Sequence, residues 1–165
     1  MPFIATGLPG LMVFEPKVFE DSRGYFFESY NSQVCKDAGI SIQFVQDNQA
    51  KSSYGVVRGL HYQLLPYAQT KFIRVLQGTI LDAVVDIRKS SPTYAKVFTI
   101  ELSAENRKQL FIPKGFAHGY SVLSPMAEVL YKCDEFYHKE SEGGINLNDP
   151  HLQIDWGISP EKQVL

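Results

Sequence analysis

The apolar residues of this chain occur in short runs rich in β-branched and aromatic side chains, with a turn about every ten residues. A β-strand is predicted for each of the runs Phe72–Leu76, Thr79–Ile87, Tyr94–Leu102, Gln109–Ile112 and Glu128–Lys132. One helix is predicted over 31–39, where an asparagine opens the segment and a glycine closes it. Many short strands at this spacing predict an all-β sandwich, jelly roll or barrel with a few short helices.

Length, composition and charge narrow the possible classes of protein. The 165 residues, of which 44% are apolar and 13% aromatic, predict one compact domain spanning 1–165. A net charge of -2 without a Lys/Arg cluster gives no reason to expect binding to nucleic acid or an anionic membrane. No run approaches the roughly 20 apolar residues of a membrane span, and the N-terminus lacks a signal-peptide pattern. We therefore expect a cytoplasmic protein in which Cys35 and Cys133 are free thiols.

Two histidines follow glycines within strand-like runs. His61 lies in the run Val57–Gln63, and His118 follows the turn that begins at Pro113. In the strand around Phe72, alternation places Lys71 on the same face as two apolar residues, so Lys71 is expected to point inward. Two histidines, a lysine and a nearby tyrosine on a β scaffold suit proton transfer beside a polarised carbonyl.

The motif Pro113-x-Gly-x-x-His118 is similar to the second half of the cupin signature, and cupins are jelly rolls with a ligand pocket between their sheets. Metal-binding cupins carry a His-x-His pair and a carboxylate in the first half. Here the corresponding residues are His61-Tyr62-Gln63, which leave too few ligands for a first-row metal. We therefore expect no metal.

Seven blocks, in order along nearly the whole chain, resemble the dTDP-4-dehydrorhamnose 3,5-epimerase family. They are Asp21–Glu28, Phe44–Asn48, Val57–Gln63, Lys71–Gly78, Val85–Tyr94, Ile112–Tyr120 and Tyr131–Asp134. The resemblance implies a cupin-type jelly-roll homodimer without cofactor. It also implies that dTDP-4-dehydro-6-deoxy-D-glucose is inverted at C3 and C5, for dTDP-L-rhamnose synthesis. Both carbons flank the C4 ketone, so a base on one face of the sugar and an acid on the other can invert each centre.

The resemblance also implies roles for individual residues. His61 is the expected base, Tyr131 the acid, and Lys71 the group that stabilises negative charge on the C4 oxygen. The remaining substrate contacts implied are Arg23, Glu28, Gln46, Asp47, Asn48, Arg58, His118, Tyr137 and Glu142. Arg58 would contact the pyrophosphate and Tyr137 would stack on thymine.

This sequence differs from the family pattern at its C-terminal end. In the family an aspartate in a C-terminal Ser-x-Lys-Asp segment orients the base histidine, whereas this sequence stops at Leu165. We expect that a short C-terminal segment is missing from the chain. Asp82 and Asp86, which share strand parity, are candidate local substitutes, with a structural salt bridge as the alternative for each.

Three alternative functions compete with the 3,5-epimerase. The first is a nucleotide-sugar 3- or 5-epimerase that inverts one centre. The second is a 3,4-ketoisomerase, and the third is a non-catalytic sugar-nucleotide-binding cupin. Support for the homodimer beyond the resemblance comes from the apolar N-terminal segment, which could pair with the sheet edge of a partner.

Overall fold

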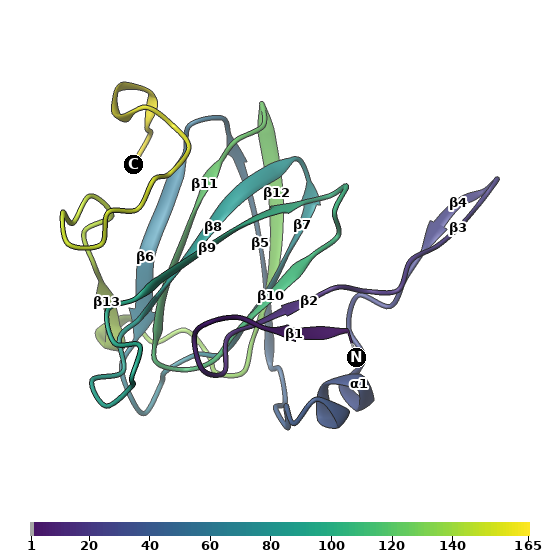
Figure 1. Ribbon diagram of the computed structural model, residues 1–165, viewed down its shortest axis with the longest axis horizontal. Helices are drawn as coiled ribbons and strands as arrows, with labels where there is room; N and C mark the ends of the chain where they lie inside the picture. Colours follow the sequence, from purple (N-terminus) through teal and green to yellow (C-terminus); the bar gives the residue numbers. More distant parts are fainter. Residues whose placement is uncertain (1) are drawn as a thin grey trace.

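Two antiparallel sheets face each other and form the body of the molecule (Figure 1). The computed structural model describes residues 2–165. One sheet has six strands, in the order β1 (Phe3–Ala5), β2 (Met12–Phe14), β10 (Gln109–Ile112), β7 (Lys71–Gln77), β12 (Met126–Cys133) and β5 (Gln46–Ser53). The other has five strands, in the order β13 (Glu142–Gly144), β6 (Val57–Gln63), β11 (Phe116–Val122), β8 (Thr79–Asp86) and β9 (Val97–Ser103).

The main hydrophobic core lies between these sheets. Ile73 and Val75 of β7 pack in the same cluster as Ile80 and Val84 of β8. Alternate residues of each strand point into this layer, as expected for two sheets packed face to face. The mainly β jelly-roll fold predicted from the sequence is therefore confirmed.

The boundaries of the predicted strands lie within two residues of the observed ones, except at one strand start. The run Val57–Gln63 is β6 as predicted, and each of the five predicted runs overlaps one strand. The prediction of a strand starting at Tyr94 was wrong, because β9 begins only at Val97. Ala95 has a left-handed φ of 62° and its N–H donates to the carbonyl of Asp86 at 2.8 Å. The chain is therefore still turning at Tyr94.

The predicted helix is α1 (Ser32–Asp37), which Asn31 caps by accepting hydrogen bonds from the N–H groups of Gln33 and Val34. Cys35 of this helix packs with Phe72 in an aromatic cluster on the outer face of the six-stranded sheet. Two short 3-10 helices complete the helical content of the described residues, namely η1 (Lys139–Ser141) and η2 (Pro160–Lys162). None of the helices within 2–165 is long and apolar enough to cross a membrane.

The N-terminal segment pairs within its own chain. β1 is antiparallel to β2, with Phe3 opposite Phe14, and β2 in turn pairs with β10. Pairing of this segment with the sheet of a partner stays a prediction, because β1 is an edge strand whose other edge pairs with no strand within 2–165. Its neighbour in the sheet is a strand only seven residues away, which makes local pairing the less costly choice.

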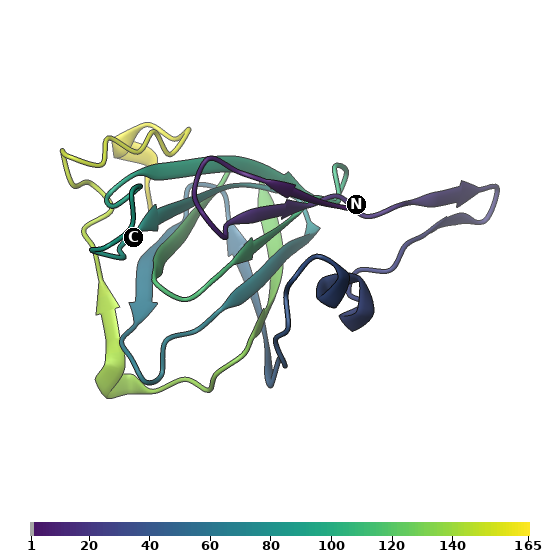
Figure 2. The ribbon, with the colours of Figure 1, turned by 60° about the horizontal axis from the view of Figure 1, so that its bottom comes forward.

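A hairpin formed by β3 (Phe19–Asp21) and β4 (Gly24–Phe26) projects far from the body, as both views show (Figures 1 and 2). All six residues of these strands are exposed. Phe19, Tyr25 and Phe26 have 55%, 60% and 67% of their surface accessible. Such a set of exposed aromatic side chains on one arm is typical of a surface that another protein covers.

Candidate active site

A pocket of about 490 Å³ opens between the two sheets. Its walls include seven residues that the sequence analysis selected: Arg58, His61, Lys71, His118, Tyr131, Tyr137 and Glu142. Tyr62, Gln63, Tyr120, Leu147 and Leu165 also line it. The pocket thus brings together titratable groups that are up to 84 positions apart in the sequence, from 58 to 142.

The five-stranded sheet supplies the two histidines. His61 of β6 lies opposite His118 of β11 in the strand register, next to an irregularity between His118 and Tyr120. Two glycines allow the strands to approach there, because a Cβ on Gly59 would lie only 2.5 Å from the Cα of Gly119. The close crossing places both imidazoles at the same wall of the pocket.

The six-stranded sheet supplies the lysine and the tyrosine. Lys71 begins β7 and shares its inward face with Ile73 and Val75, as predicted from strand parity. Tyr131 of β12 lies opposite Ile73 in the neighbouring strand. The Lys71 ammonium nitrogen lies 5.9 Å from the centroid of the Tyr131 ring, a distance at which a cation–π attraction acts.

Burial shifts the pKa of each of the three expected catalytic groups. Desolvation lowers the pKa of His61 below its ordinary value, which favours the neutral imidazole that a base requires. Desolvation raises the pKa of Tyr131, so its phenol stays protonated and can donate. The pKa of Lys71 is lowered, again chiefly by desolvation, and the charges of Cys133, Asp82 and Glu142 oppose this shift.

His118 is held by a carboxylate beneath the pocket floor. Its Nε2 lies 2.8 Å from Oδ2 of Asp82, and both side chains are buried. The other oxygen of Asp82 is buried and has no hydrogen-bond partner among the described residues. Asp86 instead forms an ion pair with Arg88 at 2.7 Å and accepts hydrogen bonds from Ser91 and Thr93.

Neither aspartate therefore contacts His61, and the suggestion that one of them takes the place of the family's C-terminal aspartate was wrong. The register of β8 against β11 places Asp82 opposite Tyr120, one strand further from β6. Asp82 thus serves the second histidine. For Asp86 the structural salt bridge is the observed outcome.

The mouth of the pocket is formed by the segment that follows β12. The Tyr137 hydroxyl donates to Oε2 of Glu142 at 2.8 Å, and Oε1 of the same carboxylate lies 3.7 Å from Nδ1 of His61. Tyr137 is 56% exposed, so its ring is free to receive a planar ligand. Arg58, in β6, donates from Nε to the Ser52 hydroxyl at 3.0 Å.

Comparison with known proteins identifies the family. The model of the dTDP-4-dehydrorhamnose 3,5-epimerase family matches residues 5–165. The chain belongs to this family. A dTDP-4-dehydrorhamnose 3,5-epimerase of Shigella flexneri is 53% identical over 159 residues, which are 96% of this chain and 88% of the relative. One of Methanothermobacter thermautotrophicus is 47% identical, over 94% of this chain and 84% of the relative.

Solved structures of the epimerase family share the fold. A crystal structure from Elizabethkingia anophelis is similar with a TM-score of 0.94 at 48% identity, covering 98% of this chain and 89% of that one. A Legionella pneumophila epimerase in complex with dTDP-4-keto-L-rhamnose has a TM-score of 0.93 at 46% identity, covering 99% and 86%. A 3'-monoepimerase from Streptomyces bikiniensis in complex with dTDP-quinovose has a TM-score of 0.88 at 29% identity, covering 96% and 79%.

Five of the substrate contacts that family membership suggests do not line the pocket. Arg23 pairs with Asp21 in the projecting hairpin, and Glu28 accepts hydrogen bonds from Asn31 at the root of that hairpin. The other three belong to β5, where Gln46 and Asp47 line a separate surface hollow and Asn48 donates to the Cys133 sulfur at 3.7 Å. Their roles stay predictions.

Gln63 is a site residue that the sequence analysis missed. Its side-chain nitrogen donates to the carbonyls of Tyr67 and Phe136, at 2.6 and 3.2 Å, and its oxygen accepts the N–H of His138 at 2.8 Å. Gln63 thereby fixes the segment that carries Tyr137. Gln63 lies two residues after His61 in the same strand, so alternation places both side chains on one face. This alternation could have identified Gln63 from the sequence.

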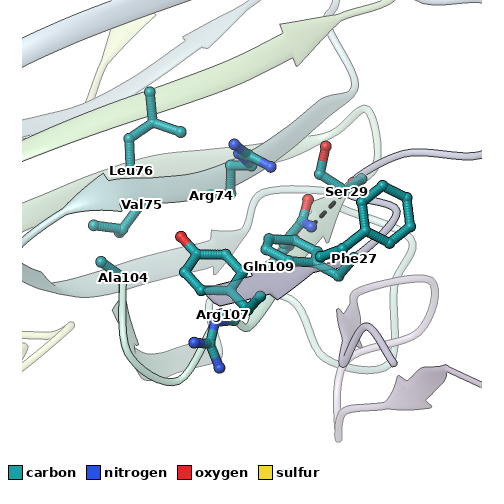
Figure 3. A pocket seen from close by; sticks show the side chains of 10 residues that line it. Phe27, Ser29, Arg74, Val75, Leu76, Ala104, Arg107 and Gln109 are labelled. Atoms are coloured by element: carbon teal, nitrogen blue, oxygen red, sulfur yellow. Dashed lines mark hydrogen bonds between the residues drawn. The ribbon is translucent and has the colours of Figure 1, made fainter. Parts of the chain in front are cut away.

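A second cavity, of about 280 Å³, lies at the root of the hairpin and contains none of the expected site residues (Figure 3). Arg74, Phe27 and Gln109 line it, and Gln109 donates to the Ser29 carbonyl at 3.0 Å. This bond attaches the segment that follows the arm to β10. Within 2–165 the structure has no group of three metal-ligating side chains.

Proposed function

We propose that this chain is a dTDP-4-dehydrorhamnose 3,5-epimerase that inverts C3 and C5 of dTDP-4-dehydro-6-deoxy-D-glucose in the cytoplasm, as a single domain without cofactor. The observation that carries the proposal is that the expected base and the expected acid lie on different sheets. His61 belongs to the five-stranded sheet and Tyr131 to the six-stranded sheet, and both line one pocket. A sugar between them has one face toward the imidazole and one toward the phenol.

The chemistry follows from this placement. His61 takes the proton from C3 or C5, and the electron pair of that C–H bond moves toward C4 to form an enolate. The ammonium of Lys71 stabilises the negative charge on the C4 oxygen. Tyr131 then donates its proton to the carbon from the opposite face, which inverts the centre, and the phenolate recovers a proton from solvent or from the imidazolium.

The nucleotide end is assigned to the mouth of the pocket. Tyr137 stacks on thymine, Arg58 contacts the pyrophosphate and His118 donates to the sugar, with Glu142 beside Tyr137. Asp82, at 2.8 Å from His118, supports this role because it holds the imidazole in one orientation.

The arm supports a homodimer. Arg23 and Glu28 can contact a nucleotide only if another copy brings them to it, because both lie outside the pocket of their own chain. The exposed aromatic residues of the hairpin are suited to packing on a partner. We therefore assign Arg23 and Glu28 to the pocket of the partner, and Gln46, Asp47 and Asn48 of β5 to the nucleotide end.

A single-centre epimerase is the second candidate. It is favoured by one observation, the similarity to a 3'-monoepimerase at 29% identity with a TM-score of 0.88. The same base and acid serve one centre if the sugar cannot turn its second proton toward His61. The higher identity to 3,5-epimerases, 53% for the Shigella flexneri protein, makes inversion at both centres the better proposal.

Proton NMR of the reaction in deuterated water tests the proposal. With dTDP-4-dehydro-6-deoxy-D-glucose as substrate, the signals of the C3 and C5 protons should both disappear as deuterium enters. The His61→Ala variant should leave both signals intact. Exchange at C3 alone would establish the single-centre enzyme, and no exchange in the wild-type protein would favour a binding cupin.

A further inference from the structure

A buried serine behind the pocket wall holds a pocket arginine that comes from the facing sheet. Ser52 belongs to β5 of the six-stranded sheet and is buried, whereas Arg58 belongs to β6 of the five-stranded sheet and lines the pocket. The Nε of Arg58 donates a hydrogen bond to the Ser52 hydroxyl at 3.0 Å. A hydrogen bond between the two sheets therefore fixes one edge of the guanidinium.

Strand alternation directs the Ser52 side chain inward. Ala50, two residues earlier in β5, lines the pocket, and side chains two positions apart in a strand lie on the same face. The neighbouring Ser53 is exposed on the other face. A turn then joins the strands, in which the Val56 N–H donates to the Ser53 carbonyl at 3.3 Å. This short connection brings Arg58 onto the facing sheet, only six residues after Ser52.

A tyrosine is the third member of this cluster. Tyr120 of β11 lies opposite Arg58 in the strand register, is buried and lines the same pocket. Burial raises the pKa of its phenol, while the charge of Arg58 and a hydrogen bond from Ser52 act in the opposite direction. A hydroxyl has one donor and two acceptor positions, so Ser52 can donate to Tyr120 while it accepts from Arg58. Both neighbours together restrict the rotation of the Ser52 hydroxyl.

The contact leaves one pair of donors on Arg58. A guanidinium binds an oxyanion in a bidentate manner either through Nε and one Nη group or through its two Nη groups. Ser52 occupies Nε, so the end with the two Nη groups is the one available. None of the carboxylates within residues 2–165 forms an ion pair with Arg58. The pocket thus has a pre-oriented cationic fork that suits an anionic ligand.

We propose that Ser52 is a positioning residue that orients Arg58 toward the diphosphate of the nucleotide. This inference rests on the proposed function, which assigns Arg58 to the pyrophosphate. The two Nη groups donate to two oxygens of one phosphate, while Ser52 stays behind the wall and does not touch the ligand. Fixing the fork in advance strengthens binding, because less side-chain freedom is lost when the ligand arrives.

The effect of Ser52 belongs to binding and not to the chemical step. The diphosphate does not react during epimerisation, so the fork contacts it equally in the ground state and in the transition state. An interaction of this kind changes KM and leaves kcat unaltered. This split distinguishes Ser52 from a residue that acts on the sugar.

The first test compares two ligands that differ only in their phosphates, dTDP and thymidine. Calorimetry of Ser52→Ala should show a dissociation constant for dTDP about tenfold higher than that of the wild-type protein, as for loss of a hydrogen bond to a charged group. The constant for thymidine should stay within about twofold. Ser53→Ala is the matched control: it removes the same hydroxyl from the exposed face of β5 and should change neither constant.

A double-variant cycle assigns the effect to the Nε contact. Lysine keeps the positive charge but has no fork and no Nε–H, so Arg58→Lys should itself weaken dTDP binding. Adding Ser52→Ala to Arg58→Lys should then weaken it by no more than about twofold, because the contact is already lost. A full tenfold further loss in the double variant would overturn the proposal, since Ser52 would then act independently of Arg58.

A third measurement needs no ligand. The Nε proton of Arg58, identified in NMR spectra by its absence from Arg58→Lys, should exchange with water about fivefold faster in Ser52→Ala than in the wild-type protein. The amide spectrum of the same sample shows whether the fold is retained. An unchanged exchange rate in a folded variant would mean that Ser52 does not hold the guanidinium.

The outcomes separate this inference from the proposed function. Weaker binding of dTDP but not of thymidine in Ser52→Ala would support the positioning role even if the protein exchanged no sugar protons. Equal losses for both ligands would overturn it, because Ser52 would then act on the pocket as a whole. Wild-type protein that binds dTDP no more tightly than thymidine would also overturn it, whatever the result of the exchange experiment. In an active enzyme, a lower kcat with unchanged KM in Ser52→Ala would contradict it as well.

Discussion

Nε2 of His118 lies 2.8 Å from the carboxylate of Asp82, and both side chains are buried at the floor of the pocket. Burial raises the pKa of Asp82, and the charge and hydrogen bond of His118 oppose this rise. The pair therefore depends on both partners, because either group alone would be a buried polar group without a partner.

Asp82→Asn should destabilise the fold and slow the enzyme. We expect the free energy of unfolding to fall by about 1–3 kcal/mol, because the amide replaces a charge-assisted hydrogen bond. Urea unfolding measures this change. Asp86→Asn is the contrasting variant, since its ion pair with Arg88 lies away from the pocket, and it should lose stability but retain kcat. Equal losses of kcat in both variants would contradict the assignment.

The activity should persist to lower pH than an ordinary histidine would allow. His61 must be neutral to accept a proton, and desolvation lowers its pKa below the ordinary value of about 6.5. The rate falls only when the pH drops through this lowered pKa. The profile of kcat/KM against pH should therefore show its acidic inflection below that value. An inflection above 6.5 would mean that another group titrates.

Lys71→Met should abolish most activity without loss of the fold. Because we propose that Lys71 stabilises the charge on the C4 oxygen, its removal should lower kcat on the order of 10²–10³-fold, as for other oxyanion donors. The positive charge of Lys71 also lowers the pKa of His61, so that pKa should rise in the variant. NMR titration of His61 checks this direction. A variant with normal kcat would remove Lys71 from the mechanism.

Mixing two inactive variants should restore activity if the arm acts in the partner. An Arg23→Ala chain has an intact pocket, and a His61→Ala chain has an intact arm. In an equal mixture that exchanges subunits, about a quarter of the pockets should be complete. Mixing His61→Ala with Tyr131→Phe is the control, because both defects lie within one pocket and no complete pocket forms. Failure of the first mixture would place Arg23 outside the partner's site.

Strand periodicity predicted much of the fold and part of the site. The bounds of β6 and the inward direction of Lys71 both followed from alternation along one strand, which is a local property. The resemblance to the family supplied the roles, and seven of the residues it selected line one pocket.

Contacts between distant strands were beyond sequence reasoning. Strand parity correctly predicted that the Asp82 side chain faces the histidines. That Asp82 contacts His118 and not His61, however, depends on the order of β6, β11 and β8 in the sheet. The contact of Glu142 with His61 likewise depends on the register of a three-residue strand that no periodicity indicates. By contrast, the hydrogen bonds that Asp86 accepts from Ser91 and Thr93 are local in sequence. The turn at Pro92, which brings these residues back to Asp86, was the sequence signal for them.

The most direct test of two opposed catalytic groups is the Tyr131→Phe variant in deuterated water. His61 should still remove the C3 proton and return a deuteron to the same face, because only the acid on the other sheet is missing. We therefore predict that deuterium enters at C3 while the sugar keeps its configuration, as followed by NMR of signal loss and coupling constants. Inversion at the wild-type rate would contradict the account, since Tyr131 would then not be the acid.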